Sequence, residues 1–445
     1  MKVVVIGCTH AGTSAVLSAA ALHRDARITV YERNDNIAFP SCGIALNIAG
    51  TAKDLRSMFY STPEALEKLG AVVKIRHDVA AVDFGARMIK TGNMVNGEVT
   101  YDTYDKLIIA TGSWPVMPKI ENSGLKNILI CKNYDHAREI ASKAESAKKA
   151  AVIGAGPVGV ELAEAFQARG MEVILIDQEK HILPRHFDAP FAQEAMKLLT
   201  RKGVHLAMGE RACSFKGDLN GRVSAITTDW GDHETSIAVL CAGSRPDTGL
   251  FKGKLDMLEN GAIKADEYMH VSVPDVFVAG DAAAVWNNAL KAHDYVPLAA
   301  NAVRMGMIAA RNLKSNTTKY PGTQSTSVIR ICGLNLASTG LTEESAARAG
   351  IGALAVSFTD GHRPEFMPQE EVTARLVYEG GSRRLLGGQI MSKADVVLAI
   401  NTISACIQKG MTIDELAFAD FFFHPYFSKP QDFLNRAASL ALPPL

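Results

Sequence analysis

Short continuous runs of apolar residues, each followed by glycine or other small residues, recur along the chain. The first run occupies residues 2–6, an Ala-rich segment follows at 13–22, and a second apolar run covers 28–31. Uninterrupted apolar runs of this length are typical of strands buried on both faces of a parallel sheet, and the Ala-rich segment favours a helix between them. The chain is therefore predicted to begin with a βαβ unit of about 30 residues.

The same succession of elements recurs in the middle of the chain. It predicts a strand at 150–153, a glycine-rich turn at 154–159, a helix at 160–169 and a strand at 172–176. An internal repeat on this scale indicates that one chain contains two nucleotide-binding units.

Three more apolar runs end in small residues, at 104–109, 237–240 and 276–279. Small residues after a strand let the backbone approach a ligand closely, so these strand ends are candidate binding positions. A helix is expected at 297–312. Beyond about residue 320 the pattern predicts an α+β domain, with strands at 325–338, 353–358, 373–378 and 385–391 and helices near 394–408 and 413–417.

The overall composition is that of a globular protein without a dominant charge. A length of 445 residues suggests about three domains. The 47 basic residues balance the 47 acidic ones, and a neutral chain lacks the electrostatic signature of nucleic-acid or anionic-membrane binding. With 47% hydrophobic and 21% charged residues, a mostly disordered chain is excluded.

The seven cysteines are too dispersed for a disulfide framework or a zinc ribbon, because none of them forms a CxxC pair. No metal site is therefore expected. The first apolar run begins at Lys2, which leaves no room for a signal peptide, and no apolar run reaches the ~18 residues of a membrane span. The sequence predicts a cytoplasmic protein.

The middle turn contains a complete GxGxxG fingerprint, formed by Gly154, Gly156 and Gly159. Glycines at these places permit a tight turn, close approach of a pyrophosphate and close packing of the following helix. Asp177, at the end of the next strand, is placed to accept a hydrogen bond from a ribose hydroxyl and would repel a 2′-phosphate. No arginine stands among residues 178–181, so this site is predicted to prefer NADH to NADPH.

The N-terminal turn carries an incomplete version of this fingerprint. Gly7 and Gly12 are present, Thr9 replaces the middle glycine, and Glu32 stands where a ribose acceptor is expected. Because the second unit is complete, the first is interpreted as another dinucleotide site. Two such sites in one chain suggest a flavin and a nicotinamide, between which a hydride passes across a shared interface.

Cys42 and His10 are the candidate residues for chemistry. Cys42 lies among small residues with a helix expected from Gly43, and a thiol at a helix N-terminus has a lowered pKa. The alternative for this residue is a buried structural cysteine. His10 lies inside the first glycine turn, where it either faces a bound ligand or is an exposed loop histidine.

Two further features have simpler alternatives. Asp281 directly follows an apolar strand, where it could hold a ribityl hydroxyl or fill a turn. The aromatic run at 421–427 is most simply explained by packing in the core or at an interface.

Several segments together resemble a known family. They are VIGCTHAG at 5–12, VYERN at 30–34, SCGIAL at 41–46, YDKLIIATGSWP at 104–115, VIGAGPVGVELAEAF at 152–166, VFVAGDAAAV at 276–285, YVPLAANAVRMG at 295–306, RPEFMP at 363–368 and PYFSKPQDFLN at 425–435. Over essentially its whole length the chain resembles the flavoprotein disulfide reductases. Within them it is most similar to the branch with a single redox cysteine, which contains NADH oxidases, NADH peroxidases and coenzyme A-disulfide reductases.

The resemblance implies a fold and a division of the chain. The fold class is α/β, with two Rossmann-like dinucleotide-binding domains, one for FAD and one for NAD, and a C-terminal α+β dimerisation domain. The FAD-binding domain would take residues 1–118 and 245–318, the NAD-binding domain 119–244, and the dimerisation domain 319–445. The same resemblance implies a homodimer, in which Phe423 of one subunit approaches the flavin of the other.

The resemblance also implies which residues contact the two cofactors. NADH is expected at Gly154, Gly156, Val158, Gly159, Asp177, His186 and Gly243. FAD is expected at Gly7, Cys8, Thr9, His10, Ala11, Gly12, Glu32, Cys42, Ala110, Thr111, Gly112, Ser113, Lys132, Asp281, Leu298, Ala299 and Ala300. This chain departs from the related oxidases at Pro157, where they carry an aromatic residue.

The implied activity is that of an FAD-dependent NADH oxidase, closest to the water-forming branch, in which two NADH and one oxygen give two water. Cys42 would cycle between thiolate and sulfenic acid, and His10 would be the nearby acid or hydrogen-bond partner. An NADH peroxidase, or a coenzyme A-disulfide or persulfide reductase, is the enzymatic alternative on the same scaffold. The alternative of another class is a redox-sensing flavoprotein that signals through Cys42 with little turnover.

Overall fold

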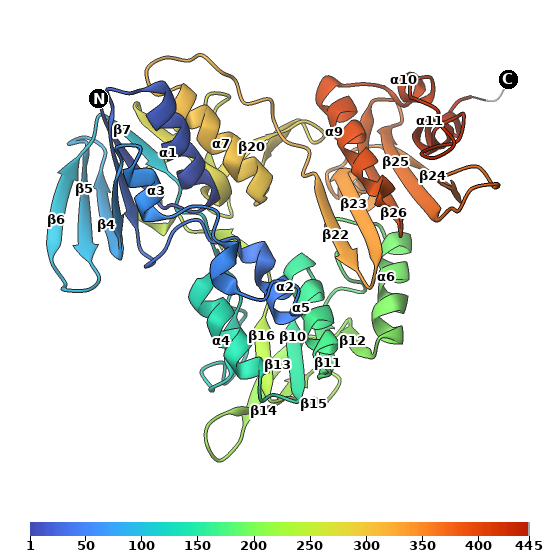
Figure 1. The fold of residues 1–445 in the computed structure, drawn as a ribbon, viewed down its shortest axis with the longest axis horizontal. Coiled ribbons are helices and arrows are strands. Elements are labelled where there is room, and N and C mark those ends of the chain that lie inside the picture. The colour runs from blue at the N-terminus through green and yellow to red at the C-terminus, as the bar shows by residue number, and fades with distance from the viewer. Residues whose placement is uncertain (444–445) are drawn as a thin grey trace.

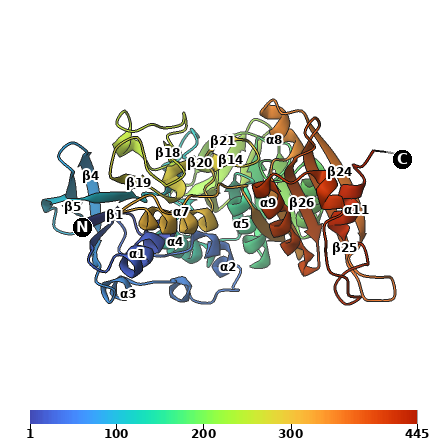
Figure 2. The ribbon, with the colours of Figure 1, turned by 90° about the horizontal axis from the view of Figure 1, so that it is seen from above.

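The computed structural model describes residues 1–443 and shows three lobes (Figure 1). The first lobe combines the N-terminal part of the chain, drawn in blue, with a later part drawn in gold. The second lobe, in teal and green, is inserted between these two parts in sequence. The third lobe, in orange and red, contains the C-terminal end and lies at the opposite end of the long axis from the N-terminus (Figure 2).

The first lobe is built on a parallel sheet of five strands in the order β19-β7-β1-β2-β3. These strands are β1 (Lys2–Ile6), β2 (Arg27–Glu32), β3 (Val72–Ile75), β7 (Lys106–Ile109) and β19 (Val276–Val278). Pairing of β19 with β7 brings the later part of the chain back into the first sheet. Because the strands are parallel, their carboxyl ends lie at one edge, where the connecting turns gather.

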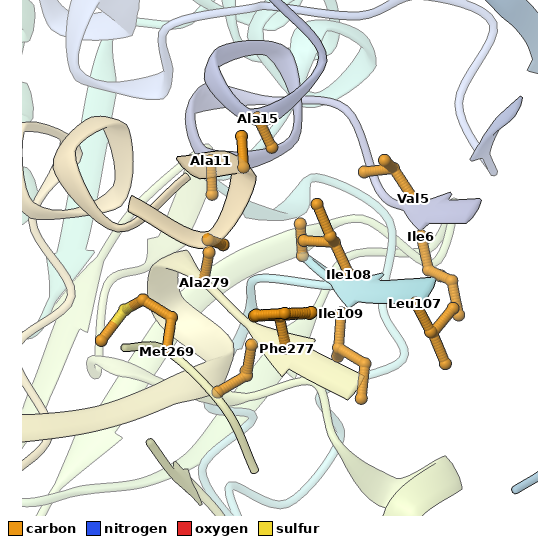
Figure 3. Packing of buried hydrophobic residues seen from close by; sticks show 14 of the residues in the cluster. Val5, Ile6, Ala11, Ala15, Leu107, Ile108, Ile109, Met269, Phe277 and Ala279 are labelled. Carbon is orange, nitrogen blue, oxygen red and sulfur yellow. The ribbon is translucent and has the colours of Figure 1, made fainter. Parts of the chain in front are cut away.

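Two helices, α1 (His10–Leu22) and α7 (Ala299–Arg311), pack against this sheet and against each other. The two helices approach closely because Gly306, on α7, has no side chain. A Cβ at this residue would lie 2.2 Å from the carbonyl oxygen of Ala11 on α1. The core beneath them consists of fully buried apolar side chains (Figure 3), among them Val5, Ala15, Ile108, Phe277 and Ala279. Burial of this apolar surface is the main stabilising contribution to the lobe.

Smaller elements complete the first lobe. Two short helices, α2 and α3, follow β2, an antiparallel sheet β4-β5-β6 follows β3, and the remaining strands form a pair, β8 with β17, and a sheet, β18-β20-β21. Their bounds are α2 (Ile44–Ile48), α3 (Pro63–Glu67), β4 (His77–Asp83), β5 (Met88–Asn93), β6 (Val99–Thr103), β8 (Ser113–Pro115), β17 (Ser244–Pro246), β18 (Ile263–Lys264), β20 (Ala283–Asn287) and β21 (Ala292–Asp294).

The second lobe repeats the architecture of the first. Its parallel sheet has the order β12-β11-β10-β16-β9 and is accompanied by three helices and a small antiparallel sheet, β13-β14-β15. The bounds are β9 (Ile128–Ile130), α4 (Tyr134–Ala144), β10 (Lys149–Ile153), α5 (Pro157–Ala168), β11 (Glu172–Asp177), α6 (Ala189–Arg201), β12 (Val204–Met208), β13 (Ala212–Gly217), β14 (Val223–Thr228), β15 (Asp232–Glu234) and β16 (Ile237–Leu240). The repeat seen in the sequence is therefore a repeat of structure.

The third lobe is an antiparallel sheet in the strand order β22-β23-β26-β25-β24, with α9 packed against β23 and β26 and α11 against β24 and β25. Its elements are β22 (Ser327–Ile331), β23 (Leu334–Gly340), α8 (Glu343–Arg348), β24 (Ala353–Gly361), β25 (Glu371–Glu379), β26 (Leu385–Ser392), α9 (Ile400–Lys409), α10 (Ile413–Ala417) and α11 (Phe433–Ser439). The predicted strand region 325–338 is a hairpin, because Cys332 and Gly333 have φ values of +49° and +83° and form a two-residue turn.

The three sheets confirm the predicted fold class, α/β with two dinucleotide-binding lobes and a C-terminal α+β lobe. Helix starts differ from the prediction: α1 begins at His10 rather than at 13, and α5 at Pro157 rather than at 160. The second half of each glycine turn is thus already helical, which places free N–H groups at the turn. Within residues 1–443, none of the helices has the length and apolar character needed to cross a membrane.

Candidate active site between two dinucleotide turns

The first candidate site is the glycine turn between β1 and α1. Gly7 has a φ of +91°, and a Cβ at this residue would lie 2.3 Å from the carbonyl oxygen of Ala110. A Cβ at Gly12 would lie 1.9 Å from the carbonyl oxygen of Gly7, so only glycine fits at both places. Glu32, at the end of β2, accepts a hydrogen bond from the N–H of Cys8 at 2.7 Å. Its side chain is buried, and burial raises its pKa.

The second candidate site, between β10 and α5, has the same construction. Gly154 has a φ of +110°, and a Cβ there would lie 2.3 Å from the carbonyl oxygen of Cys241. Asp177, at the end of β11, accepts a hydrogen bond from the N–H of Ala155 at 2.6 Å. A Cβ at Gly156 would meet no atom within 4 Å, so the backbone at this glycine is open to an approaching ligand.

The equivalence of the two turns extends to the acidic side chains. In each, the acid at the end of the second strand binds the N–H of the residue after the first glycine. The other carboxylate oxygen accepts from the chain just beyond, from the N–H of Asn34 at 2.9 Å in the first turn and of Glu179 at 2.9 Å in the second. A carboxylate has further lone pairs for a ribose hydroxyl, so both turns can accept a dinucleotide.

Three polar residues expected to contact the flavin meet at the junction of the first two lobes. The hydroxyl of Ser113 donates to Asp281 at 2.7 Å, and the ammonium of Lys132 donates to Ser113 at 2.9 Å. Lys132 and Asp281 form an ion pair at 3.7 Å. The hydroxyl of Thr111 is buried and has no hydrogen-bond partner among the described residues. An orphan hydroxyl beside such a cluster fits a ligand rich in hydroxyl and carbonyl groups, as FAD is.

His10 is the first residue of α1, so its expected position within a loop is wrong. Its ring is half-buried and stacks on the ring of Tyr60, with centroids 5.1 Å apart and an interplanar angle of 5°. Burial lowers the pKa of His10, while Asp281 opposes and Lys132 reinforces that lowering. The imidazole is therefore neutral near pH 7, which suits a hydrogen-bond partner better than a cationic acid.

Cys42 lies in a 3-10 turn, Ser41–Gly43, directly before α2, and is exposed, so the alternative of a buried structural cysteine is wrong. Helix α2 packs on α5 of the second lobe (Figure 1), where Ile44 and Ile48 join the hydrophobic cluster that contains Phe166. This packing holds the thiol at the junction between the two dinucleotide lobes.

The lowered pKa expected for Cys42 is not found. Although the residue as a whole is exposed, neighbouring atoms partly desolvate its thiol, which raises the pKa of Cys42, and the nearby carboxyl of Glu161 raises it further. Helix α2 has only five residues, too few for its dipole to outweigh these two effects.

Glu161 is a site residue that the sequence analysis missed. It lies on α5 and is half-buried, and desolvation together with Glu164 raises its pKa to about 7. The available signal was its place on α5, two residues after Gly159 and one helical turn after Val158, on the helix whose N-terminus faces the second dinucleotide turn.

The remaining residues expected to bind NADH surround the second turn. Val158 is 44% exposed on the first turn of α5, and Gly243, with a φ of +92°, is open on its Cβ side. His186 lies in the loop between β11 and α6, where burial lowers its pKa. On the flavin side, the N-terminus of α7 is formed by Leu298, Ala299 and Ala300.

Phe423 is not brought together with the other flavin-site residues of the same chain, because it lies in the third lobe between α10 and α11. Within the run 421–427, Phe421 packs against the core of the third lobe. Phe422, Phe423 and Phe427 are exposed, so packing in the core does not explain these three side chains.

Two glycine-cradled dinucleotide turns with a cysteine at the junction of their lobes define a two-nucleotide oxidoreductase. The family model "Pyridine nucleotide-disulphide oxidoreductase" matches residues 1–306, and the model of the dimerisation domain of this family matches 326–432. The chain belongs to the pyridine nucleotide-disulphide oxidoreductase family.

Three full-length relatives stand close to the chain. It is 47% identical to an NADH oxidase of Enterococcus faecalis over 443 residues, which cover 99% of each protein. The structure of a water-forming NADH oxidase from Lactobacillus brevis bound to NADH matches with a TM-score of 0.97 and 46% identity, over 99% of this chain and 98% of that one. An engineered water-forming NADPH oxidase bound to NADPH matches with a TM-score of 0.97 and 45% identity, over the same shares.

Proposed function

We propose that this chain is an FAD-dependent NADH oxidase that reduces oxygen to water, two NADH and one oxygen giving two water. The observation that carries the proposal is the position of Cys42, an exposed thiol at the junction of two lobes that each hold a dinucleotide turn. Full-length similarity to enzymes named as NADH oxidases supports oxygen as the acceptor.

FAD would lie on the first turn and NADH on the second. When bound, FAD supplies hydride acceptance and electron transfer to oxygen, which amino-acid side chains cannot provide. The chain itself contributes two oriented carboxylates for the riboses, Glu32 and Asp177, and an ammonium and hydroxyl, Lys132 and Ser113, at the junction of the lobes. Neutral His10 offers a hydrogen bond beside them.

Cys42 would complete the reduction from peroxide to water. Its thiolate sulfur attacks one peroxide oxygen, the O–O bond breaks, and the other oxygen leaves as hydroxide and takes a proton to become water. Sulfur supplies the two electrons and becomes sulfenic acid, which the second NADH reduces with release of another water. Because the pKa of Cys42 is raised, the thiol must pass its proton to an acceptor. The Glu161 carboxylate, whose charge acts on Cys42, would be one such acceptor, and neutral His10 would be the second.

The variant Cys42→Ser tests this function. A serine hydroxyl does not ionise near neutral pH and cannot replace a thiolate, so the variant should remain an oxidase but stop at hydrogen peroxide. An oxygen electrode should record one oxygen per NADH, with oxygen regained on adding catalase. The matched variant Cys213→Ser, on β13 of the second lobe, should keep the stoichiometry of the parent, two NADH per oxygen.

A Cys42→Ser enzyme that still forms only water would show that the cysteine is not the second reductant. The same assay separates the alternatives. A peroxidase consumes NADH only when peroxide is supplied, a disulfide or persulfide reductase needs its sulfur substrate, and a redox sensor shows little turnover with any of them.

We also propose a cytoplasmic homodimer that pairs through the third lobe. The family model matched over 326–432 is that of a dimerisation domain. The loop after α10 exposes a group of aromatic side chains that a second copy would cover, namely Phe418, Phe422, Phe423, Tyr426 and Phe427. Sedimentation of Phe423→Asp should show monomer or a concentration-dependent mixture; an undisturbed dimer would place the interface elsewhere.

The domain boundaries at 118, 244 and 318 remain predictions.

A further inference from the structure

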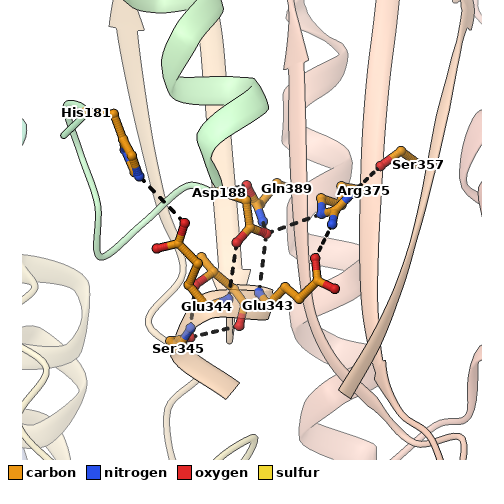
Figure 4. A network of polar contacts seen from close by, with 9 residues as sticks. His181, Asp188, Glu343, Glu344, Ser345, Ser357, Arg375 and Gln389 are labelled. Carbon is orange, nitrogen blue, oxygen red and sulfur yellow. Dashed lines mark hydrogen bonds and ion pairs between the residues drawn. The ribbon is translucent and has the colours of Figure 1, made fainter. Parts of the chain in front are cut away.

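A buried polar network joins the second lobe to the third, at the start of α6 (Figure 4). Its centre is Asp188, which is 4% exposed. The amide of Gln389 donates to the Asp188 carboxylate at 2.6 Å, and the guanidinium Nε of Arg375 lies 3.3 Å from the same oxygen. The N–H of Asp188 in turn donates to the side-chain oxygen of Gln389 at 2.8 Å.

The third lobe supplies further partners to the network. The N–H groups of Glu343 and Glu344, at the start of α8, donate to the Asp188 carboxylate at 3.3 and 3.4 Å. Arg375 also pairs with the carboxylate of Glu343 and donates to the hydroxyl of Ser357 at 2.7 Å. A buried carboxylate is costly unless it is paired and hydrogen-bonded. The third lobe therefore supplies the partners that Asp188 needs.

Asp188 ends the loop that follows the acid of the second dinucleotide turn. This loop, residues 178–188, connects β11 to α6 and carries His186. Its middle is tied back to the glycine turn, since the N–H of Leu183 donates to the carbonyl of Ala155 at 2.8 Å, and Leu183 is fully buried with a φ of +56°. The loop is thus fixed at two points, one on the dinucleotide turn and one on the third lobe.

His181 adds a second link between the same two lobes. Its ring nitrogen lies 3.7 Å from the carboxylate of Glu344, while its other ring nitrogen contacts the carbonyl of Ile182. The two contacts with the third lobe, at His181 and Asp188, lie on either side of His186 in the sequence. The backbone of the segment that carries His186 is therefore held from both ends of its loop.

We propose that Asp188 is a positioning residue for NADH, because through Gln389 and Arg375 it fixes the loop of His186 against the third lobe and so sets the affinity for the coenzyme. This inference rests on the proposed function in assigning the second turn and His186 to NADH. It makes coenzyme affinity depend on a contact between the NAD-binding lobe and the dimerisation lobe. The network makes no contact with the thiol, so the chemical step should not depend on it.

The test measures coenzyme binding in purified, FAD-loaded Asp188→Asn and Gln389→Leu. Both should raise the KM for NADH and the Kd for NAD⁺, measured by calorimetry, by about three- to tenfold, with kcat within about twofold of the parent. The double variant should show little more than the larger single effect, because both changes break one contact. Arg375→Lys keeps the charge but loses the planar fork, and should give a smaller shift in the same direction.

A matched control is Asp414→Asn, which breaks the ion pair of Arg383 and Asp414 inside the third lobe, at 2.5 and 2.6 Å. It should lower the melting temperature without changing KM or Kd. If the Asp188 and Gln389 variants also lose only thermal stability, the network is merely structural and the inference is overturned. If the parent consumes no NADH in air while Asp188→Asn still weakens NAD⁺ binding, the proposed oxidase activity fails and this inference stands.

Discussion

Replacing Glu161 by glutamine removes a titratable group that lies close to Cys42. Burial and Glu164 favour the protonated carboxyl and raise its pKa from an ordinary value of 4.5 to about 7. The difference, 7 − 4.5 = 2.5 pH units, corresponds to about 3 kcal/mol at 1.36 kcal/mol per unit. Solvent screening at a half-buried position reduces this to about 1–2 kcal/mol.

The sign follows from proton binding. The folded protein holds the Glu161 proton more tightly than the unfolded chain, so this stability is fully present below about pH 4.5 and is lost as pH rises through about 7. Glu161→Gln has no such loss. We expect the variant and the parent to melt alike at pH 4.5, and the variant to melt about 1–2 °C higher at pH 8.

Thermal unfolding of the FAD-loaded protein, followed by circular dichroism at both pH values, measures this difference. Glu139→Gln, at an exposed position on α4, reports the effect of the substitution itself. A difference in melting temperature between Glu161→Gln and the parent that does not change with pH would refute the reasoning.

The charge of Glu161 also raises the pKa of Cys42, so alkylation of Cys42 by iodoacetamide at pH 8 should be faster in Glu161→Gln. An unchanged alkylation rate would show that the charge of Glu161 does not raise the pKa of Cys42.

The other predictions concern specificity, cofactor and packing. Asp177→Ala with Gln178→Arg should move the preference from NADH towards NADPH, and a parent that uses both equally would contradict the role of Asp177. The protein should be yellow, with FAD rather than FMN extracted on chromatography; a colourless protein that cannot be reconstituted would overturn the account. Gly306→Ala forces a Cβ to 2.2 Å from a backbone oxygen and should cost about 1–3 kcal/mol, whereas Gly352→Ala, with open space, should change stability by about 0.5 kcal/mol or less.

The fold could be predicted because its parallel strands are buried on both faces. The runs that became β1 and β16 show no alternation, and their flanking glycines mark the turns. The strongest signal in the sequence is the repeated spacing of glycines and acid. At the first glycine of each turn a Cβ would lie 2.3 Å from a backbone carbonyl oxygen, so no other residue fits there. Antiparallel sheets such as β4-β5-β6 have half-exposed faces and short turns, which give a weaker hydrophobic pattern in the sequence.

The electrostatics of the site could not be predicted in the same way. The pKa of Cys42 depends on Glu161, which lies on a helix of another lobe, and on desolvation that the sequence does not reveal. His10 stacks on Tyr60, and its position at a helix start rather than in a loop follows from where α1 begins. Likewise, Asp188 finds its partners about two hundred residues later, at Gln389, a distance over which a single sequence carries no pairing signal.

The two dinucleotide turns share one construction but differ in access, and this difference fits their proposed duties. Glu32 is 3% exposed, and both of its oxygens are bound by neighbouring N–H groups. Asp177 accepts the two equivalent bonds from backbone N–H groups but is only partly buried, and Val158 on the first turn of α5 is 44% exposed. A cofactor that stays bound gains from burial, whereas a coenzyme that leaves at each turnover needs an open turn. The unequal burial of two turns built alike therefore suits the proposed division, a retained flavin at Glu32 and an exchanged NADH at Asp177.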